Sequence, residues 1–447
     1  MSDLENFMAT ASLNWKTQPN SDLIVPSLRH SFAWTLAGSL VYAGCQWGML
    51  SVLAKLGSPA IVGQFALALA ITAPVFMFTN LQLRGVQATD AQSEYEFPDY
   101  FTLRCLTMIA GMAIVAGVVA ASRYDWTTSL VILLVAVAKA VESLSDVVAG
   151  LLQKFERLDR VAIGLMIRGG VSVSAFGIVF WKSNSLICAT SALVVSWTAV
   201  VIAYDFQMAH KVLASKQVPL RFNRNNLQHL AFLALPIGIV SALFSLKANF
   251  PRYVVERLLG SSQLGIFASL AYLVIVLEMI SNALGQSVVA RLSQMFAKRD
   301  FRQFRRLLTK LLLFGAMLCA IGVLAAAFMG RAVITMVYGP PYAADMRCFL
   351  VMVFTAGTNA IGSFLLYGLT AARNFKIQLP IVGCSVLVAI ILSFALIPRY
   401  QLLGAALALL MSVIVQLLLS GLALIITLRS AYVMKTVHAN VDFVPLV

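Results

Sequence analysis

Apolar and polar positions alternate along this chain in long segments rather than in single residues. Between Phe32 and Leu428, about a dozen apolar segments of roughly 20 residues each are separated by short polar breaks. A hydrocarbon core about 30 Å thick needs about 20 apolar residues per helix, so the pattern predicts membrane-spanning helices. The predicted spans are 32–54, 59–83, 100–122, 127–150, 160–181, 185–207, 229–250, 263–289, 306–328, 345–369, 376–397 and 402–428.

The predicted fold class is an all-α integral membrane protein of about 12 transmembrane helices. The runs 129–138 and 404–426 are apolar on every side, whereas strands of a membrane barrel alternate at every second residue. Hydrophobic residues make up 60% of the chain, charged residues make up 11%, and the mean hydropathy is +0.88. This composition excludes a water-soluble domain, and the short breaks leave no room for a separate one.

Lysine and arginine in the loops predict the orientation. Residues 1–30 are polar and contain no signal-peptide pattern, so the first span is expected to serve as the insertion signal. If the N-terminus lies inside, 22 of the 33 basic residues fall in inside segments and 8 in outside loops. The positive-inside rule then places both termini in the cytoplasm.

The formal net charge of +15 follows largely from this topology. Nucleic-acid binding is not expected, because the charge is spread over loops without interleaved aromatic residues. The densest basic run, 297–310, can also contact the anionic headgroups of membrane lipids.

Two windows of the chain resemble one another, LGSPAIVGQFA from Leu56 and LGSSQLGIFA from Leu259. Several matched residues are 202 positions apart: Gly63 and Gly265, Phe65 and Phe267, Ala66 and Ala268, Asn80 and Asn282. A duplication of six helices gives two lobes of the same orientation with a cavity between them. The predicted organisation is a cytoplasmic tail at 1–30, lobes at 31–209 and 229–428, a cytoplasmic linker at 210–228 and a cytoplasmic tail at 429–447.

The fourth predicted span carries three charges on one face. Lys139, Glu142, Ser143 and Asp146 stand at i, i+3, i+4 and i+7. Each charge at the bilayer centre costs about 3 kcal/mol, so these side chains are expected to face protein or water. Lys139 can neutralise Glu142, which leaves Asp146 in need of a cation, a proton or a basic group of another helix. The stripe is therefore either a functional site or an interhelical salt-bridge network that fixes packing.

Other polar residues lie in the fifth, seventh and eighth spans. Arg168 and Lys247 either meet the carboxylates of the fourth span across the lobe interface or line a cavity that attracts an anionic substrate. Arg252 follows Pro251 about one and a half turns beyond Lys247, where the two can form a basic wall. The remaining candidates are the intramembrane charge Glu278, four residues before Asn282, and, for a polar cavity or helix packing, Ser143, Asn80, Asn249 and Asn282.

Cysteine and histidine do not point to catalysis. The six cysteines have no CxxC spacing, and the four histidines lie at helix ends or in cytoplasmic segments. We therefore expect no metal site, no cofactor and no enzyme activity.

The stretch KAVESLSDVVAGLLQKFERLDRVAIGLMIRG, from Lys139 to Gly169, resembles the fourth and fifth helices of bacterial polysaccharide transporters, the O-antigen and capsule repeat-unit flippases. These flippases belong to the multidrug/oligosaccharidyl-lipid/polysaccharide exporter superfamily. The two repeat windows support the match, as does YGPPYAADM from Tyr338, which is similar to the family's YG-x-x-Y-A signature.

The resemblance implies the fold of multidrug and toxic compound extrusion transporters, in which two six-helix lobes enclose a cavity that opens alternately to each side. It also implies a lipid-linked oligosaccharide substrate, undecaprenyl-diphosphate with a short glycan, which is flipped across the bacterial inner membrane. Because a diphosphate needs partners in a low-dielectric region, Lys139, Arg168, Lys247 and Arg252 are assigned to a basic substrate cavity. Glu142, Asp146 and Glu278 are the candidate carriers of a coupling ion, H+ or Na+, and polysaccharide polymerase or assembly proteins are possible partners.

Two other functions stay open. A drug or cation antiporter of the same fold would use the intramembrane carboxylates for exchange. A membrane glycan polymerase or ligase would need a folded outside loop, but the longest outside connection, 330–344, has only about 15 residues. A major-facilitator transporter is disfavoured because RGVQATDAQ, after the second span, lacks that family's basic motif.

Overall fold

The computed structural model describes residues 28–90, 93–216, 224–372, 374 and 377–441. Most of the predicted N-terminal tail, part of the predicted linker and the end of the predicted C-terminal tail lie outside these residues. The N-terminal half contains α2 (Leu28–Leu56), α3 (Pro59–Thr79), α4 (Leu83–Thr89), α5 (Phe97–Ala121), α6 (Trp126–Lys154), α7 (Leu158–Ser183), α8 (Leu186–Val200), a π-helix (Val201–Asp205) and α9 (Phe206–Lys216). The C-terminal half contains α10 (Arg224–Leu259), α11 (Ser261–Ala297), α12 (Phe301–Val337), a 3₁₀ turn (Pro340–Ala343), α13 (Met346–Ala371) and α14 (Gln378–Val441).

The all-helical prediction is confirmed for the residues that the structure describes. Ten of their helical stretches are long and apolar enough to cross a membrane. One of these, within α14, is broken at Gln401, whose φ of 52° is not helical, so it consists of two antiparallel arms. Helix α6 is absent from this set and carries the three predicted intramembrane charges.

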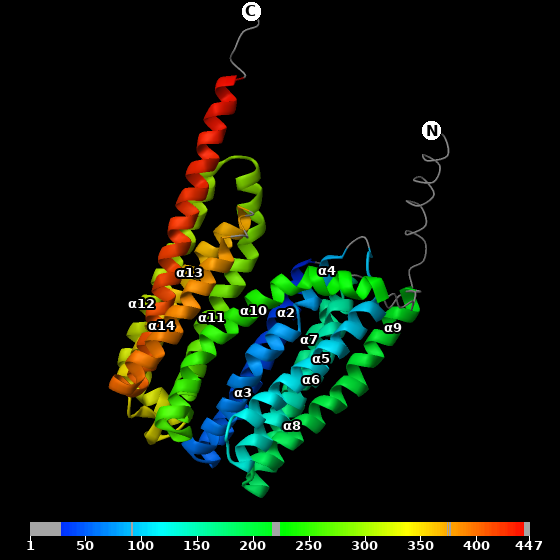
Figure 1. The fold of residues 1–447 in the computed structure, drawn as a ribbon, viewed down its shortest axis with the longest axis vertical. Coiled ribbons are helices and arrows are strands. Elements are labelled where there is room, and N and C mark those ends of the chain that lie inside the picture. Colours follow the sequence, from blue (N-terminus) through cyan, green and yellow to red (C-terminus); the bar gives the residue numbers. More distant parts are fainter. Residues whose placement is uncertain (1–27, 91–92, 217–223, 373, 375–376, 442–447) are drawn as a thin grey trace, which may run out of the picture.

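The helices run antiparallel between two faces of the molecule (Figure 1). We call the face on which α2 begins and α14 ends the terminal face, and the opposite one the distal face. The terminal face holds the segments between α3 and α5, α6 and α7, α11 and α12, and α13 and α14. Distal connections are short, and side chains cap two of the helices that follow them: Ser58 accepts the N–H of Ile61, and Asp125 accepts that of Thr128.

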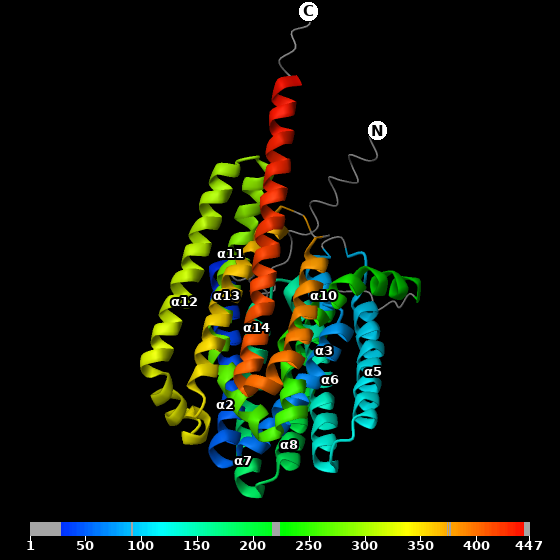
Figure 2. The same ribbon diagram turned by 60° about the vertical axis from the view of Figure 1, so that its left-hand side comes forward.

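The two halves of the chain form two bundles that pack together unevenly (Figures 1 and 2). Toward the distal face, one hydrophobic core contains residues of both bundles, including Leu50, Phe65 and Phe267. Toward the terminal face the cores are separate except where the first turns of α10 pack on the N-terminal bundle. Leu308 and Phe364 belong to the core of the C-terminal bundle, whereas other clusters fill the terminal ends of the N-terminal bundle.

Helix α10 links the bundles. Its first turns lie on the terminal end of the N-terminal bundle, where Leu230 and Ala234 pack into the cluster around Tyr100. The segment predicted as a linker, 210–228, is helical at both ends, since α9 extends to Lys216 and α10 begins at Arg224. The predicted span 229–250 ends too early, because α10 continues through Pro251 to Leu259. A proline removes one backbone hydrogen bond, which a membrane helix tolerates when its neighbours support it.

Candidate functional site

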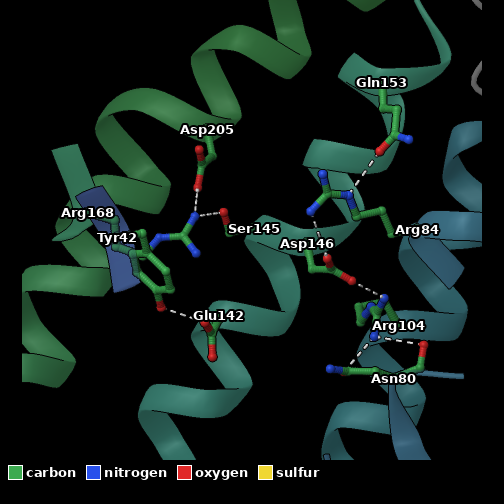
Figure 3. A network of polar contacts seen from close by, with 10 residues as sticks. All are labelled: Tyr42, Asn80, Arg84, Arg104, Glu142, Ser145, Asp146, Gln153, Arg168 and Asp205. Atoms are coloured by element: carbon green, nitrogen blue, oxygen red, sulfur yellow. Dashed lines mark hydrogen bonds and ion pairs between the residues drawn. The ribbon is translucent and has the colours of Figure 1, made fainter. Parts of the chain in front are cut away.

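The charged stripe of α6 faces a polar pocket inside the N-terminal bundle (Figure 3). Lys139 forms an ion pair with Glu142, with 2.7 Å between Nζ and Oε2. The other carboxylate oxygen of Glu142 accepts a hydrogen bond of 2.6 Å from the Tyr42 hydroxyl on α2. The Lys139 ammonium also lies 5.7 Å from the ring centre of Trp197, within cation–π range. The predicted Lys139–Glu142 pair is therefore present and is fixed by an aromatic residue on each side.

Asp146 obtains its basic partners from other helices. The Arg104 guanidinium on α5 lies 3.0 Å from one carboxylate oxygen, and that of Arg84 on α4 lies 3.7 Å from the other. Arg104 is completely buried and also donates to the backbone carbonyl of Asn80, at 3.0 Å, and to its side-chain amide oxygen. Arg84 donates to the side chain of Gln153 at 3.1 Å. Asp146 thus joins α4, α5 and α6.

Arg168 lies deeper in the bundle and forms a second buried pair. Its guanidinium lies 3.1 Å from a carboxylate oxygen of Asp205, and the two side chains are 5% and 6% exposed. It also donates to the Ser145 hydroxyl. Asp205 is the last residue of the π-helix Val201–Asp205, and such insertions shift the side chains that follow them and recur at functional sites.

These residues enclose a pocket of about 300 Å³ that runs from the middle of α6 toward the terminal face. Its walls contain five of the residues predicted from the sequence: Asn80, Lys139, Glu142, Asp146 and Arg168. Ser143 is not among them; it is buried, and its hydroxyl donates to the backbone carbonyl of Lys139 at 2.8 Å. The ion pairs around the pocket join four cations to three carboxylates, so the charge is largely cancelled.

The charged residues of the C-terminal bundle have different partners. The Lys247 ammonium donates to the side-chain amide oxygen of Gln416 on α14 at 2.6 Å and lies 5.7 Å from the ring centre of Phe244. Arg252 donates to the side-chain amide oxygen of Asn249 at 2.9 Å, and its buried Nε has no hydrogen-bond partner. Among the described residues, no ion pair is formed by either cation.

Two more predicted residues of this bundle are held by weak contacts. Glu278 accepts one hydrogen bond, at 3.5 Å, from the side-chain amide of Asn359 on α13. Asn282, the counterpart of Asn80 in the repeat, accepts a hydrogen bond of 3.4 Å from the Tyr367 hydroxyl. The carboxylate of Glu278 is therefore the only one of the three coupling candidates without an ion pair in the described part of the chain.

The four predicted cations form two groups instead of one cavity wall. Lys139 and Arg168 line the pocket of the N-terminal bundle, whereas Lys247 and Arg252 lie on α10 and do not line it. The sequence leaves the partners of Arg168 and Lys247 undecided. In the structure Arg168 pairs with Asp205 of its own bundle, and Lys247 donates to the side-chain amide of Gln416.

Another ion pair lies at the terminal end of the N-terminal bundle. The Lys154 ammonium lies 3.3 Å from a carboxylate oxygen of Asp90, which also accepts the backbone N–H groups of Glu94 and Tyr95. Burial raises the pKa of Asp90, but the two N–H groups and the Lys154 charge outweigh it and hold this pKa below its usual range. The loop after α4 is thereby attached to the end of α6.

Comparisons with known proteins agree with this architecture. No family model matches the chain. The capsular polysaccharide biosynthesis protein CapF of Staphylococcus aureus is 29% identical over 397 residues, which cover 87% of this chain and 97% of CapF. The lipid II flippase MurJ, in an inward closed conformation, has a similar structure, with a TM-score of 0.71 at 12% identity over 92% of this chain and 93% of MurJ. A MATE transporter in a bent conformation matches with a TM-score of 0.59 at 10% identity over 93% of this chain and all of that one.

These likenesses confirm the resemblance to polysaccharide transporters and flippases that the sequence predicts. They also confirm the expected fold class, because MurJ and MATE transporters share the fold. The chain is a multi-pass membrane protein with the fold that MurJ and MATE transporters share.

Proposed function

We propose that this protein translocates undecaprenyl-diphosphate-linked oligosaccharide repeat units across the bacterial inner membrane by alternating access. The extensive match to a capsular polysaccharide biosynthesis protein supports a glycan substrate. The fold shared with a lipid II flippase supports a lipid-linked one. The excess of basic residues on the terminal face supports its placement in the cytoplasm, with lobes near 31–209 and 229–428 and a linker near 210–228.

The observation that carries the proposal is the pair of cations on α10, Lys247 and Arg252, which are bound by amide oxygens and not by carboxylates. An amide solvates a cation without cancelling its charge. The Glu278 carboxylate also interacts with both cations, but it is one charge against two, so a net positive charge remains. A diphosphate that enters a low-dielectric region needs such charge-assisted hydrogen bonds. Arg252 has an unused buried donor for this purpose in its Nε.

The pocket of the N-terminal bundle suits the glycan part of the substrate. Lys139 and Arg168 offer donors, and Glu142 and Asp205 offer acceptors within the same walls. Sugar hydroxyls both donate and accept hydrogen bonds, so they match a wall of mixed polarity better than a diphosphate does. We therefore assign the diphosphate to the α10 cations and the sugars to this pocket.

Ion coupling is assigned to Glu278. Glu142 and Asp146 each have basic partners within ion-pair distance, whereas Glu278 contacts only the amide of Asn359. A carboxylate without a fixed counter-ion can take up H+ or Na+ without breaking a salt bridge. Its location on α11 puts it in the same bundle as Lys247.

Deletion of the gene in the source bacterium tests the function. We expect loss of a surface polysaccharide and accumulation of its lipid-linked repeat unit on the cytoplasmic side. Complementation with the wild-type chain should restore the polysaccharide, and the variant Lys247→Gln should not. An unchanged surface polysaccharide together with lost resistance to cationic dyes would contradict the proposal and favour a drug antiporter.

A further inference from the structure

The two bundles touch most closely where α3 crosses α11, near the distal face (Figure 1). Gly63 and Gly265 face each other at this crossing. A Cβ atom built on Gly63 would collide with the carbonyl oxygen of Ser261 and lie 3.1 Å from the backbone nitrogen of Gly265. A Cβ atom built on Gly265 would collide with the carbonyl oxygen of Pro59 and lie 2.9 Å from the backbone nitrogen of Gly63.

The contact is symmetric in the sequence as well as in space. Gly63 and Gly265 occupy matching positions of the internal repeat, 202 residues apart, and the same offset relates Pro59 to Ser261. Each glycine therefore rests on the carbonyl group four residues before the other one. The colliding atoms belong to the backbone of a helix, so no flexible side chain can move aside, and only glycine permits this approach.

Two of the hydrogen bonds between the bundles are made by aromatic side chains, Trp47 and Tyr253. The indole Nε1 of Trp47 on α2 donates to the Tyr338 hydroxyl at 2.7 Å. The Tyr253 hydroxyl on α10 donates to the backbone carbonyl of Ala70 on α3. Tyr338 is the first residue of the YGPPYAADM segment, and its buried ring lies 5.6 Å from that of Tyr342. The two repeat windows and the YGPPYAADM segment thus lie at the same distal seam, the contact surface between the two bundles.

We propose that Gly63, Gly265, Trp47, Tyr338 and Tyr253 form a distal latch that sets the balance between the two access states. The bundles share one core at the distal face, whereas toward the terminal face only the first turns of α10 connect them, and this indicates a state that is closed at the distal face. Opening toward the distal face must separate the glycine crossing and break both hydrogen bonds. The inference rests on the alternating access of the proposed function, but it concerns the conformations and not the substrate.

The latch makes a prediction about single methyl groups. Gly63→Ala and Gly265→Ala each add a methyl group that the closed seam cannot hold, so both shift the protein toward distal opening. Gly117→Ala on α5 is the matched control, because a Cβ atom there has no neighbour within 4 Å. Trp47→Phe and Tyr338→Phe remove one hydrogen bond without adding atoms, and they should shift the balance in the same direction by a smaller amount.

Spin-label distances test the latch in the full chain, purified in lipid nanodiscs without substrate. One label pair is placed at the distal face through Lys182→Cys and Arg399→Cys, and another at the terminal face through Lys211→Cys and Arg302→Cys. All four positions are exposed, and the six native cysteines are replaced beforehand. In both glycine variants we expect longer distal distances and shorter terminal ones, and in Gly117→Ala the wild-type distributions.

Wild-type distances in both glycine variants would overturn the latch. If neither glycine variant accumulates in membranes, the variants Trp47→Phe and Tyr338→Phe provide the test. Unchanged distal distances in both of them would overturn the latch. Because no substrate is present, a failed latch is distinguishable from a failed assignment of the lipid-linked glycan.

Discussion

The two halves of this molecule share a repeated sequence but stabilise their intramembrane charges by different chemistry. In the N-terminal bundle each carboxylate of the pocket is matched by a basic group, as in the buried pair of Arg168 and Asp205. In the C-terminal bundle the partners of Lys247 and Arg252 are amides. Even matched positions have diverged, since Asn80 accepts from a guanidinium and Asn282 from a tyrosine hydroxyl.

The difference separates charges that are neutralised inside their own bundle from charges that can receive an anionic ligand. An ion pair in low dielectric cancels its own field, and breaking it strands a buried charge. A cation held by an amide keeps its field and can accept an anion without such a loss. The duplicated backbone therefore supplies two similar bundles, and the choice between carboxylate and amide gives each one its role.

The largest effect is expected from Arg168→Gln. It leaves the Asp205 carboxylate buried without its counter-ion, which costs about 3–5 kcal/mol for pairs of this kind. We expect little folded protein in the membrane and a lowered unfolding temperature in detergent. The double variant Arg168→Gln with Asp205→Asn removes both charges and should recover most of the protein level. If the single variant is as stable as the wild type, the pair does not hold the bundle together.

Lys247→Gln should affect transport and not folding. Its partner Gln416 is neutral, so no charge is stranded, and the protein level should stay near that of the wild type. We expect at least a tenfold loss of surface polysaccharide, since about 1.4 kcal/mol of lost binding already gives a factor of ten. Lys298→Gln, at an exposed position between α11 and α12, is the control and should behave as the wild type. Equal polysaccharide in both variants would show that the α10 cation is not used.

Glu278→Gln tests the assignment of ion coupling. The substitution should make transport insensitive to an imposed H+ or Na+ gradient, with a rate reduced about tenfold or more, while the protein level stays high. Glu142→Gln instead releases the Lys139 ammonium from its ion pair and should lower the protein level. Transport that responds normally to the gradient in Glu278→Gln would transfer the coupling role to another residue.

The smallest effect is expected from Asp90→Asn, at the terminal end of the N-terminal bundle. Because the pKa of Asp90 is lowered on folding, this group stabilises the protein above its unfolded pKa of about 3.9, and the contribution is lost as the pH falls through the folded pKa. We expect a loss of roughly 1–2 kcal/mol near neutral pH, in line with hydrogen bonds to charged groups. The unfolding temperatures of the wild type and the variant should approach each other as the pH falls below about 4, and they should coincide once the pH is below the folded pKa of Asp90. A difference that persists there would contradict the assignment.

The sequence predicts the fold well because the bilayer restricts the choices. Segments of apolar residues must be helices, and the spans 59–83 and 345–369 match α3 and α13 within a few residues. The pairing of Lys139 with Glu142 is also predictable, since it depends only on helical spacing.

Contacts between distant helices escape sequence reasoning. Arg104 is assigned to a cytoplasmic loop because it stands near the predicted start of a span at residue 100, yet α5 begins at Phe97 and places it two turns inside. Tyr42 and Gln416 lie 100 and 169 residues from their partners, and no local pattern marks them. Asp205 stands near the end of the predicted span 185–207, but the π-helix that it ends and its pair with Arg168 have no sequence signal.

The central claim, that the α10 cations receive the diphosphate of a lipid-linked glycan, is tested most directly by reconstitution. Purified protein is placed in liposomes that carry undecaprenyl-diphosphate oligosaccharide, and the glycan that reaches the opposite leaflet is measured by its accessibility to a membrane-impermeant reagent. We predict translocation by the wild type and at most about a tenth of that rate for Lys247→Gln combined with Arg252→Gln. Equal rates for the wild type and the double variant would contradict the account.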